Sequence, residues 1–266
     1  MRKIHKAWLI GSETPVGQAI LKQIDTMKIN IIATDMDDVD VSQIDEALSF
    51  SYLNHPDAVI NCYDLYDIDE CEKNPIKAYK INSIVPRNLA ICSRKIEARF
   101  IHLSTTSIFS KEIERGYTEF DEPSPSGIYA KSKFQGEKYV RELNNKYFIV
   151  RSDYIYGKKE DLIKRPFKEN KIISPTSCNE IASFIISLMD TPEYGVYHAS
   201  STGTCTYNEF LKKYSELSND TSILELINKN TDCIKNIKID KFMLKLCNVY
   251  KFPNWKEDLE KYINNY

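Results

Sequence analysis

The sequence predicts an α/β fold in which a doubly wound parallel sheet carries a smaller lobe built from the C-terminal part of the chain. Over the first 157 residues, short apolar runs alternate with stretches of helical periodicity, and each run is apolar throughout. Strands that are buried on both faces have this composition, and alternating strands and helices build parallel sheets. At 266 residues the chain is also long enough to bury a sizeable core.

Five apolar runs predict the strands, at residues 6–10, 29–34, 58–61, 99–104 and 147–151. Apolar side chains at helical spacing predict helices at residues 17–27, 42–53, 75–93 and 129–145. Gly11 ends the first strand and opens a tight turn into the first helix. One more helix and strand are expected to return to the sheet at about residues 177–200, so the sheet domain comprises residues 1–157 and this returning unit.

The remaining segments of residues 158–266 are expected to form the small lobe. The Lys- and Glu-rich run at residues 158–171 predicts a solvated helix face, and the polar run at 218–222 predicts a loop. The stretch PNWKEDL at residues 253–259 predicts a capped terminal helix.

Composition and charge argue against several classes of partner. A net charge of −2, from 36 basic and 38 acidic residues, provides no electrostatic footprint for nucleic acid or an anionic membrane. No apolar run approaches the roughly 20 residues that span a bilayer, and the N-terminus shows no cleavable signal pattern. The cysteines form no C-x-x-C pair, and no histidine or carboxylate cluster has metal spacing, which argues against a zinc site and a disulfide framework. We therefore expect a cytoplasmic protein without a metal, whose reduced thiols lie at positions 62, 71, 92, 178, 205, 233 and 247.

Tyr129 and Lys133 are the residues most informative about chemistry. They lie four residues apart in the helix expected at 129–145, so they share one helical face. A free phenol has a pKa near ~10 and is a poor acid at neutral pH. A lysine ammonium one turn away, within hydrogen-bonding reach of a cofactor ribose, favours the phenolate and lowers the phenol's pKa. The pair predicts a proton donor for the reduction of a carbonyl by hydride.

Other segments match one protein family in order and spacing. They are GSETPVG at 11–17, VIN at 59–61, Asn82, HLST at 102–105, YTEFDEP at 117–123, Gly136-Glu137, RSDYIYG at 151–157, SPT at 174–176 and YHAS at 197–200. With Tyr129 and Lys133, they make the chain resemble the extended short-chain dehydrogenase/reductases, and within these the dTDP-4-dehydrorhamnose reductase group of sugar-nucleotide reductases. The resemblance covers nearly the whole chain. It implies a Rossmann-like dinucleotide-binding domain and a substrate-binding lobe.

The resemblance implies NAD(P)H-dependent reduction of a 4-keto group on a nucleotide-activated deoxysugar, in the synthesis of L-rhamnose or related surface-polysaccharide sugars. Tyr129 would protonate the developing alkoxide, Lys133 would tune Tyr129 and hold the ribose, and Thr105 would orient the carbonyl, with Ser104 as the runner-up. For Thr105, a hydroxyl that merely caps a loop stays an alternative. The residues expected to contact the sugar are Tyr66, Ile68 and Tyr154. A homodimer stays open.

The turn between the first strand and the first helix is the expected pyrophosphate site. Gly11 and Gly17 allow a phosphate to approach backbone N–H groups and the positive end of the helix. Thr14 stands where the family has its middle glycine, and Pro15 removes one backbone donor, while Val16 completes the turn. A plain strand-to-helix turn that has lost its nucleotide therefore stays an alternative.

Asp35, at the end of the second strand, is expected to accept hydrogen bonds from an adenosine ribose and to repel a 2′-phosphate. Met36 follows it where the family often carries arginine, so both residues favour NADH over NADPH. The alternative for Asp35 is a solvated acid in an acidic run. Further cofactor-lining residues implied by the resemblance are Asp40, Asn61, Cys62, Tyr63 and Asn82, although either asparagine could satisfy a buried turn instead.

His102 and His198 lie in expected strands and are interpreted as core residues. A non-catalytic nucleotide-binding or regulatory subunit of the same fold, resembling the regulatory partner of methionine adenosyltransferase, is the main alternative to an enzyme, favoured by Thr14 and a short lobe. A different epimerase or dehydratase is disfavoured, because Thr106 rather than an Asp-Glu pair follows Thr105.

Overall fold

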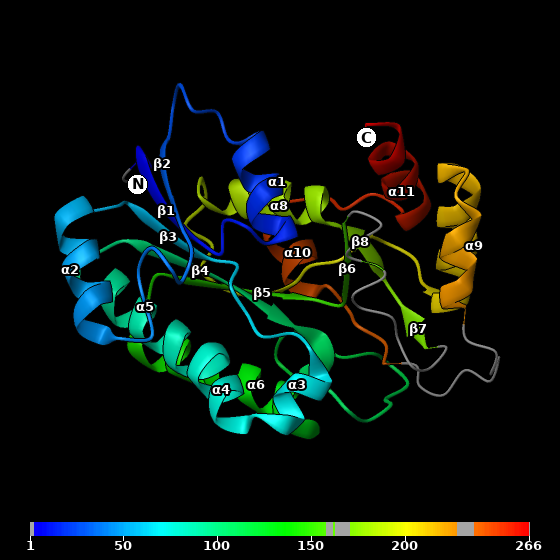
Figure 1. The fold of residues 1–266 in the computed structure, drawn as a ribbon, viewed down its shortest axis with the longest axis horizontal. Helices are drawn as coiled ribbons and strands as arrows, with labels where there is room; N and C mark the ends of the chain where they lie inside the picture. Colours follow the sequence, from blue (N-terminus) through cyan, green and yellow to red (C-terminus); the bar gives the residue numbers. More distant parts are fainter. Residues whose placement is uncertain (1–2, 158–161, 163–170, 228–236, 266) are drawn as a thin grey trace.

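The computed structural model describes residues 3–157, 162, 171–227 and 237–265, and it confirms the predicted α/β class (Figure 1). Six strands form one parallel sheet in the order β2-β1-β3-β4-β5-β9. Their bounds are β1 Lys6–Ile10, β2 Asn30–Thr34, β3 Ala58–Asn61, β4 Arg99–Thr105, β5 Tyr147–Ser152 and β9 Gly195–His198. The chain runs outward from β1 to β2 and then returns to β3 on the other side of β1. In such sheets ligands bind outside the carboxyl ends of the strands, where the strand order reverses.

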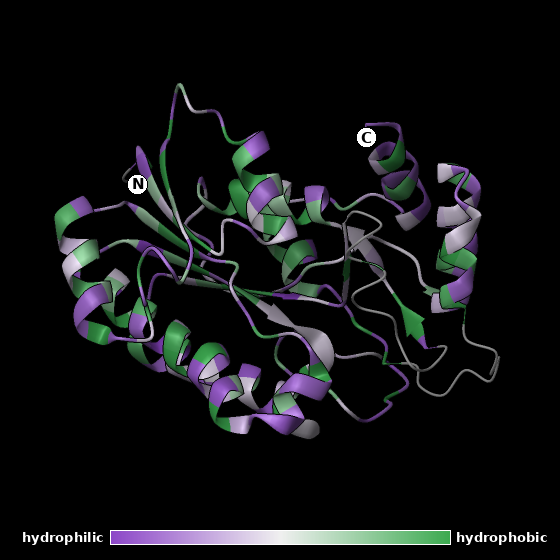
Figure 2. Cartoon of the chain, in the orientation of Figure 1, coloured by the Kyte–Doolittle hydropathy of each residue, from purple (hydrophilic) through white to green (hydrophobic). Residues whose placement is uncertain are grey.

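Helices cover both faces of the sheet, as a doubly wound fold requires (Figure 1). On one face α1 Pro15–Gln23 packs against α8 Cys178–Leu188. On the other face α5 Val85–Lys95 packs against both α2 Ile44–Asn54 and α6 Gly127–Leu143. Figure 2 shows green and purple residues on the same helices, because one stripe of each helix is buried against the sheet and the other faces solvent.

The first helix differs from the predicted residues 17–27 at both ends, because its capping decides its length. Pro15 occupies the first helical turn, where a missing N–H costs nothing, and the Thr14 side chain accepts a hydrogen bond from Gly17 N. The helix ends at Gln23, since Ile24 has an extended backbone.

The helix predicted at residues 75–93 is three segments, namely α4 Pro75–Tyr79, the π-helix η1 Lys80–Ile84 and α5. Pro86 has no N–H to donate to the Asn82 carbonyl, so the α-helical pattern cannot continue there. Val85 N donates instead to Lys80 O, five residues back. The wider turn therefore falls on Asn82, a predicted cofactor-site residue.

Several elements outside the central sheet were not predicted. They are α3 Ile68–Lys73, the parallel pair β6 Tyr154–Tyr156 and β8 Pro175–Ser177, the antiparallel pair β7 Ile172–Ile173 and β10 Cys205–Thr206, α9 Tyr207–Ser218, and α10 Phe242–Cys247. The loop predicted at residues 218–222 is only partly correct, because the 3-10 helix η3 Thr221–Leu226 begins inside it. The predicted terminal helix is confirmed as α11 Trp255–Asn264, with a capping box between Asn254 and Glu257.

The core on one face of the sheet continues into the small lobe. Apolar residues of β1, α1, α8, β6, α9 and α11 belong to a single buried cluster.

The helix face predicted at residues 158–171 lies outside the described residues, apart from its positions 162 and 171. Over the ranges that the structure describes, no helix combines the length and apolarity needed to cross a membrane.

Candidate active site

The carboxyl ends of the parallel strands gather the predicted site residues at one edge of the sheet. Ile10 pairs with Thr34 of β2 and with Asn61 of β3, so the first turn, Asp35 and Asn61 lie side by side. Asn61 in turn pairs with His102 of β4, three residues before Thr105. The tertiary fold thus unites positions that are far apart in the sequence.

Backbone contacts explain both glycines of the turn. Gly11 has φ +82°, and a Cβ there would lie 2.6 Å from Tyr63 N in the loop after β3. A Cβ at Gly17 would lie 2.1 Å from the Gly11 carbonyl oxygen. The turn is therefore pressed between α1 and the β3 loop, and no side chain fits at either position.

Thr14 strengthens the turn in which it replaces a glycine. Its hydroxyl donates to Gly11 O at 2.7 Å and accepts from Gly17 N at 3.1 Å, so its side chain caps α1. Pro15 follows at the start of the helix, and Val16 is buried beneath it. The positive end of α1 consequently remains at this edge of the sheet.

Asp35 reaches into the same turn. Its Oδ2 accepts hydrogen bonds from Ser12 Oγ and, at 3.1 Å, from Glu13 N. Asp35 is thus held against the turn and is partly buried. Asp40 has a local role, because its carboxylate accepts from Ser42 N at 3.0 Å and from the Ser42 hydroxyl, which lowers the pKa of Asp40.

Asn61 and the two predicted core histidines are buried. Asn61 Nδ2 lies 3.1 Å from His102 Nδ1. Burial and then the charge of Lys133 hold the pKa of His102 well below its usual value. His198 Nδ1 lies 2.8 Å from Asp240 O, and burial lowers the pKa of His198 to about 4. Both rings are neutral at pH 7.

Asn82 clamps the loop after β3 onto α6. Its Oδ1 accepts from Leu65 N at 2.9 Å, and its Nδ2 donates to Leu65 O at 3.0 Å and to Ser132 Oγ at 3.1 Å. The clamped loop begins with two predicted cofactor residues, the buried Cys62 and the half-buried Tyr63. Asn82 therefore shapes the wall of the site and satisfies a buried turn at the same time.

Lys133 and Tyr129 lie on α6, one turn apart. The Lys133 side chain is 1% exposed, and its Nζ donates to Leu103 O at 2.9 Å. The same nitrogen lies 3.4 Å from Asp64 Oδ2. Tyr129 is half-buried, and its carbonyl accepts from Ser132 Oγ at 2.9 Å. The structure thus places both residues on one helix, a turn apart, as the spacing predicts, and it buries the Lys133 side chain.

Thr105 and Ser104 end β4 in different environments. Thr105 Oγ1 accepts from Ser107 N at 3.1 Å and caps the 3-10 helix η2 Thr106–Ile108. A hydroxyl that accepts one bond can still donate its proton, so the cap leaves Thr105 chemically competent. Ser104 Oγ donates to the buried Glu137 Oε1 at 2.6 Å, so this hydroxyl belongs to a structural network.

That network centres on Glu137 and Arg151, whose side chains are both fully buried. Arg151 donates from Nε to both carboxylate oxygens of Glu137, at 3.0 and 3.1 Å, and from Nη2 to Oε2 at 2.6 Å. Burial alone would raise the pKa of Glu137, but the Arg151 charge holds it below the usual value. The pair braces α6, and with it Lys133, against β4 and β5.

The three residues expected to contact a sugar differ in how exposed they are. Tyr66 and Ile68 are exposed in and after the β3 loop. Tyr154 is buried, with its ring packed edge-on against Tyr207 and Phe210 of α9. The structure therefore brings Tyr66 and Ile68 to the surface beside the site, while Tyr154 supports the core of the small lobe.

The roles of three residues of the site were missed in the sequence. Asp64 gives no signal beyond being an acid soon after a buried strand. Glu137 and Arg151 were noted only as parts of motifs, and their pairing has no local signature. Within the described residues, no group of three His, Cys, Asp or Glu side chains is arranged to hold a metal ion.

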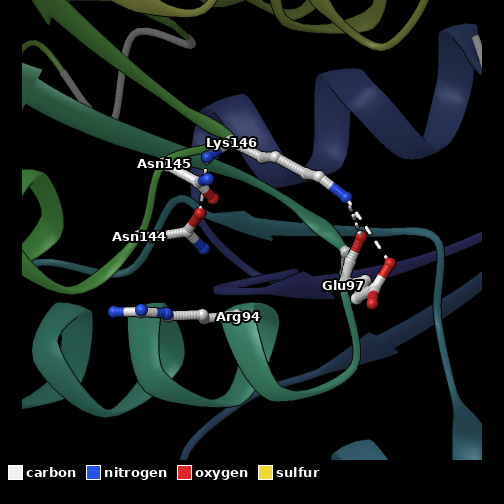
Figure 3. A pocket seen from close by; sticks show the side chains of 6 residues that line it. Arg94, Glu97, Asn144, Asn145 and Lys146 are labelled. Carbon is white, nitrogen blue, oxygen red and sulfur yellow. Dashed lines mark hydrogen bonds and ion pairs between the residues drawn. The ribbon is translucent and has the colours of Figure 1, made fainter.

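A separate cavity of about 250 Å³ lies at the opposite edge of the sheet (Figure 3). It is lined by Arg94, Glu97, Ala98, Asn144, Asn145 and Lys146. These residues precede β4 and β5 or end the neighbouring helices, so the cavity is at the amino ends of the strands. Because ligands of doubly wound sheets bind at the carboxyl ends, this cavity is separate from the candidate active site.

Comparisons with known proteins agree with this geometry. The chain is 30% identical over 235 residues to the spore coat polysaccharide biosynthesis protein SpsK of Bacillus subtilis, covering 83% of this chain and 82% of that protein. A crystal structure of a dTDP-4-dehydrorhamnose reductase from Clostridium acetobutylicum has a TM-score of 0.86 and 30% identity, covering 98% of this chain and 99% of that one. The dTDP-4-dehydrorhamnose reductase of Bacillus anthracis in complex with NADP also has a TM-score of 0.86, with 28% identity over 100% of this chain and 99% of that one.

The family model described as the RmlD substrate binding domain matches residues 5–266. This match spans both the sheet and the small lobe. It confirms the resemblance to sugar-nucleotide reductases of the extended short-chain dehydrogenase/reductase type. The chain belongs to the RmlD substrate-binding domain family.

Proposed function

We propose that this protein is an NAD(P)H-dependent reductase that acts on a 4-keto group of a nucleotide-activated deoxysugar, in the synthesis of surface-polysaccharide sugars. The observation that carries the proposal is the buried Lys133, which is fixed to Leu103 O one helical turn from Tyr129, at the carboxyl edge of the sheet. The likeness to a dTDP-4-dehydrorhamnose reductase solved with NADP supports the substrate class and the cofactor.

The residues at the carboxyl edge fit a dinucleotide. The turn from Gly11 to Gly17 and the N-terminus of α1 would hold the pyrophosphate, and Asp35 would accept a hydrogen bond from the adenosine ribose. Bound NAD(P)H would supply the hydride. The Asp35 carboxylate beside the turn would repel a 2′-phosphate, which favours NADH over NADPH.

The protein's own part is to hold the carbonyl and provide a proton. Tyr129 would donate its phenolic proton to the developing alkoxide, and Thr105 would donate a hydrogen bond to the same oxygen. Lys133 would stabilise the phenolate that remains and hold a ribose hydroxyl. Positioned acid catalysis of this kind contributes about 10²–10⁴-fold to the rate.

The lobe built from residues 158–266, without the returning α8 and β9, would hold the sugar. Tyr66 and Ile68 are exposed beside the site and would contact it from the sheet domain. Tyr154 would act through packing, because its ring is buried against α9.

A regulatory subunit without catalysis is less well supported. That alternative depends on Thr14 as a damaged nucleotide turn and on the short lobe. Against the first of these, the Thr14 hydroxyl closes the turn through Gly11 O and Gly17 N. The intact Tyr129, Lys133 and Thr105 also oppose it.

The test follows NADH absorbance with a dTDP-4-keto-6-deoxy-sugar for the wild type, Tyr129→Phe and the control Tyr139→Phe on the same helix. We expect turnover by the wild type and the control, and a loss of about 10²–10⁴-fold in kcat for Tyr129→Phe with coenzyme binding retained. If the wild type bound NADH but reduced no 4-keto nucleotide sugar, the regulatory function would replace this proposal.

A further inference from the structure

Asp64 places a carboxylate beside Lys133 in the proposed active site. It follows β3 in the loop that Asn82 clamps to α6, and its Oδ2 lies 3.4 Å from Lys133 Nζ. The Asp64 side chain is 23% exposed, whereas the Lys133 side chain is 1% exposed. The Lys133 side chain is thus covered by protein atoms, while its carboxylate partner is partly exposed.

Other ionisable groups surround this ion pair. The charges of Asp67, Glu70 and Glu72 act on Cys71 together with Asp64, and Glu72 Oε1 accepts from Ile128 N, next to Tyr129, at 2.7 Å. Burial raises the pKa of both Cys62 and Cys71, the latter to about 11, so these thiols are neutral at pH 7. Burial likewise raises the pKa of the adjacent Tyr63. His102, which faces Lys133 from β4, is neutral, as shown above. The carboxylate in direct contact with Lys133 Nζ is that of Asp64, at 3.4 Å.

This balance bears directly on Tyr129. The Lys133 ammonium favours the phenolate form of a tyrosine one turn away, and a carboxylate beside that ammonium offsets part of the effect. Asp64 also supplies Lys133 with a second fixed partner besides Leu103 O. The carboxylate can therefore affect both where the ammonium lies and how strongly it acts.

We propose that Asp64 is a positioning residue of the reaction proposed above, which anchors Lys133 and limits how far its charge promotes ionisation of Tyr129. The role of Asp64 in the reaction rests on the proposed function. The electrostatic effect, in which the Asp64 carboxylate restrains the ionisation of Tyr129, can be measured without any substrate.

The experiment titrates the Tyr129 ring by NMR in protein labelled with ¹³C at tyrosine Cζ, with the signal assigned by its loss in Tyr129→Phe. Asp64→Asn removes the charge with little change of shape, and Asp64→Glu restores it. Asp67→Asn is the matched control, because it removes the same charge three residues along. Asp67 caps α3 by accepting from Glu70 N at 2.9 Å, a role that asparagine also fills.

In Asp64→Asn the midpoint of the Tyr129 titration should move to lower pH by roughly half a unit or more. It should stay unchanged in Asp67→Asn and return toward the wild-type value in Asp64→Glu. Since Tyr129 acts as an acid, the alkaline limb of the pH–rate profile should move in the same direction. Equal midpoints in the wild type and Asp64→Asn, or equal shifts in Asp64→Asn and Asp67→Asn, would overturn the proposal.

The two proposals fail in different ways. A wild type without turnover would refute the proposed function, while the substrate-free NMR titration would still decide the influence of Asp64. A wild type with turnover whose Tyr129 titration ignores Asp64→Asn would refute only the role of Asp64.

Discussion

Breaking the buried pair between Glu137 and Arg151 should destabilise the protein far more than breaking an exposed pair. Both side chains are fully buried, and three nitrogen–oxygen contacts of 2.6–3.1 Å join them. Glu137→Gln leaves the Arg151 guanidinium without its counter-charge in the core. Loss of one partner of such a pair costs about 3–5 kcal/mol in the free energy of unfolding.

The matched control is the exposed pair between Asp25 and Lys28, whose side chains are 49% and 72% exposed. Although its nitrogen and oxygen lie only 2.8 Å apart, water screens the pair, and Asp25→Asn should leave the free energy of unfolding close to that of the wild type. Urea unfolding at pH 7 measures both free energies. Thermal melting should show Glu137→Gln at least about 6 °C below the wild type.

The pH dependence provides a second check. Because the folded-state pKa of Glu137 is lowered, its stabilising contribution is present above its unfolded pKa and is lost as the pH falls through the folded value. The difference between wild type and Glu137→Gln should therefore shrink in acid. A Glu137→Gln protein as stable at pH 7 as Asp25→Asn would refute the assignment of this pair as the brace of the site.

Three further predictions concern the turn, the coenzyme and the core. Gly17→Ala should weaken dinucleotide binding by at least about tenfold, because the alanine Cβ would lie 2.1 Å from Gly11 O. A fluorescence titration with the coenzyme measures the affinity, and an unchanged affinity would contradict the close-packed turn. Asp35→Ser should raise the ratio of kcat/KM for NADPH to that for NADH, since it removes the carboxylate facing a 2′-phosphate; an unchanged ratio would exclude Asp35 from the ribose site. For His198, whose pKa falls to about 4, protonation favours the unfolded chain as the pH drops below about 6.5. From pH 7 to 5 the wild type should therefore lose about 2 kcal/mol more than His198→Gln in urea unfolding, and equal losses would show that His198 is not buried neutral.

The sheet was largely predictable because its signal is local. Each strand of the parallel core is a short apolar run, and the six strands lie close to the expected positions. Helix ends were less predictable, because single residues decide them. Pro15 starts α1 two residues before the expected position, and Pro86 converts one expected helix into three segments.

The small lobe was predicted as an appended region with a helix face at residues 158–171, a loop at 218–222 and a terminal helix. The strands β6, β7, β8 and β10 are two or three residues long, so they carry no periodicity that a sequence pattern could reveal. They form because distant partners pair with them, such as Tyr154 with Pro175. Such pairing is a property of the folded chain.

The sequence by itself determined the parallel sheet, the glycine turn and the spacing of Tyr129 and Lys133 on one helix. Each of these features depends on residues that lie close together in the sequence. Only the tertiary structure decided what surrounds them. Asp64 meets Lys133 across 69 residues, and Ser104 meets Glu137 across 33. Contacts of this kind arise where strand ends and helices converge, and no local pattern encodes them. They are needed there because a polar group that is buried without a partner costs free energy.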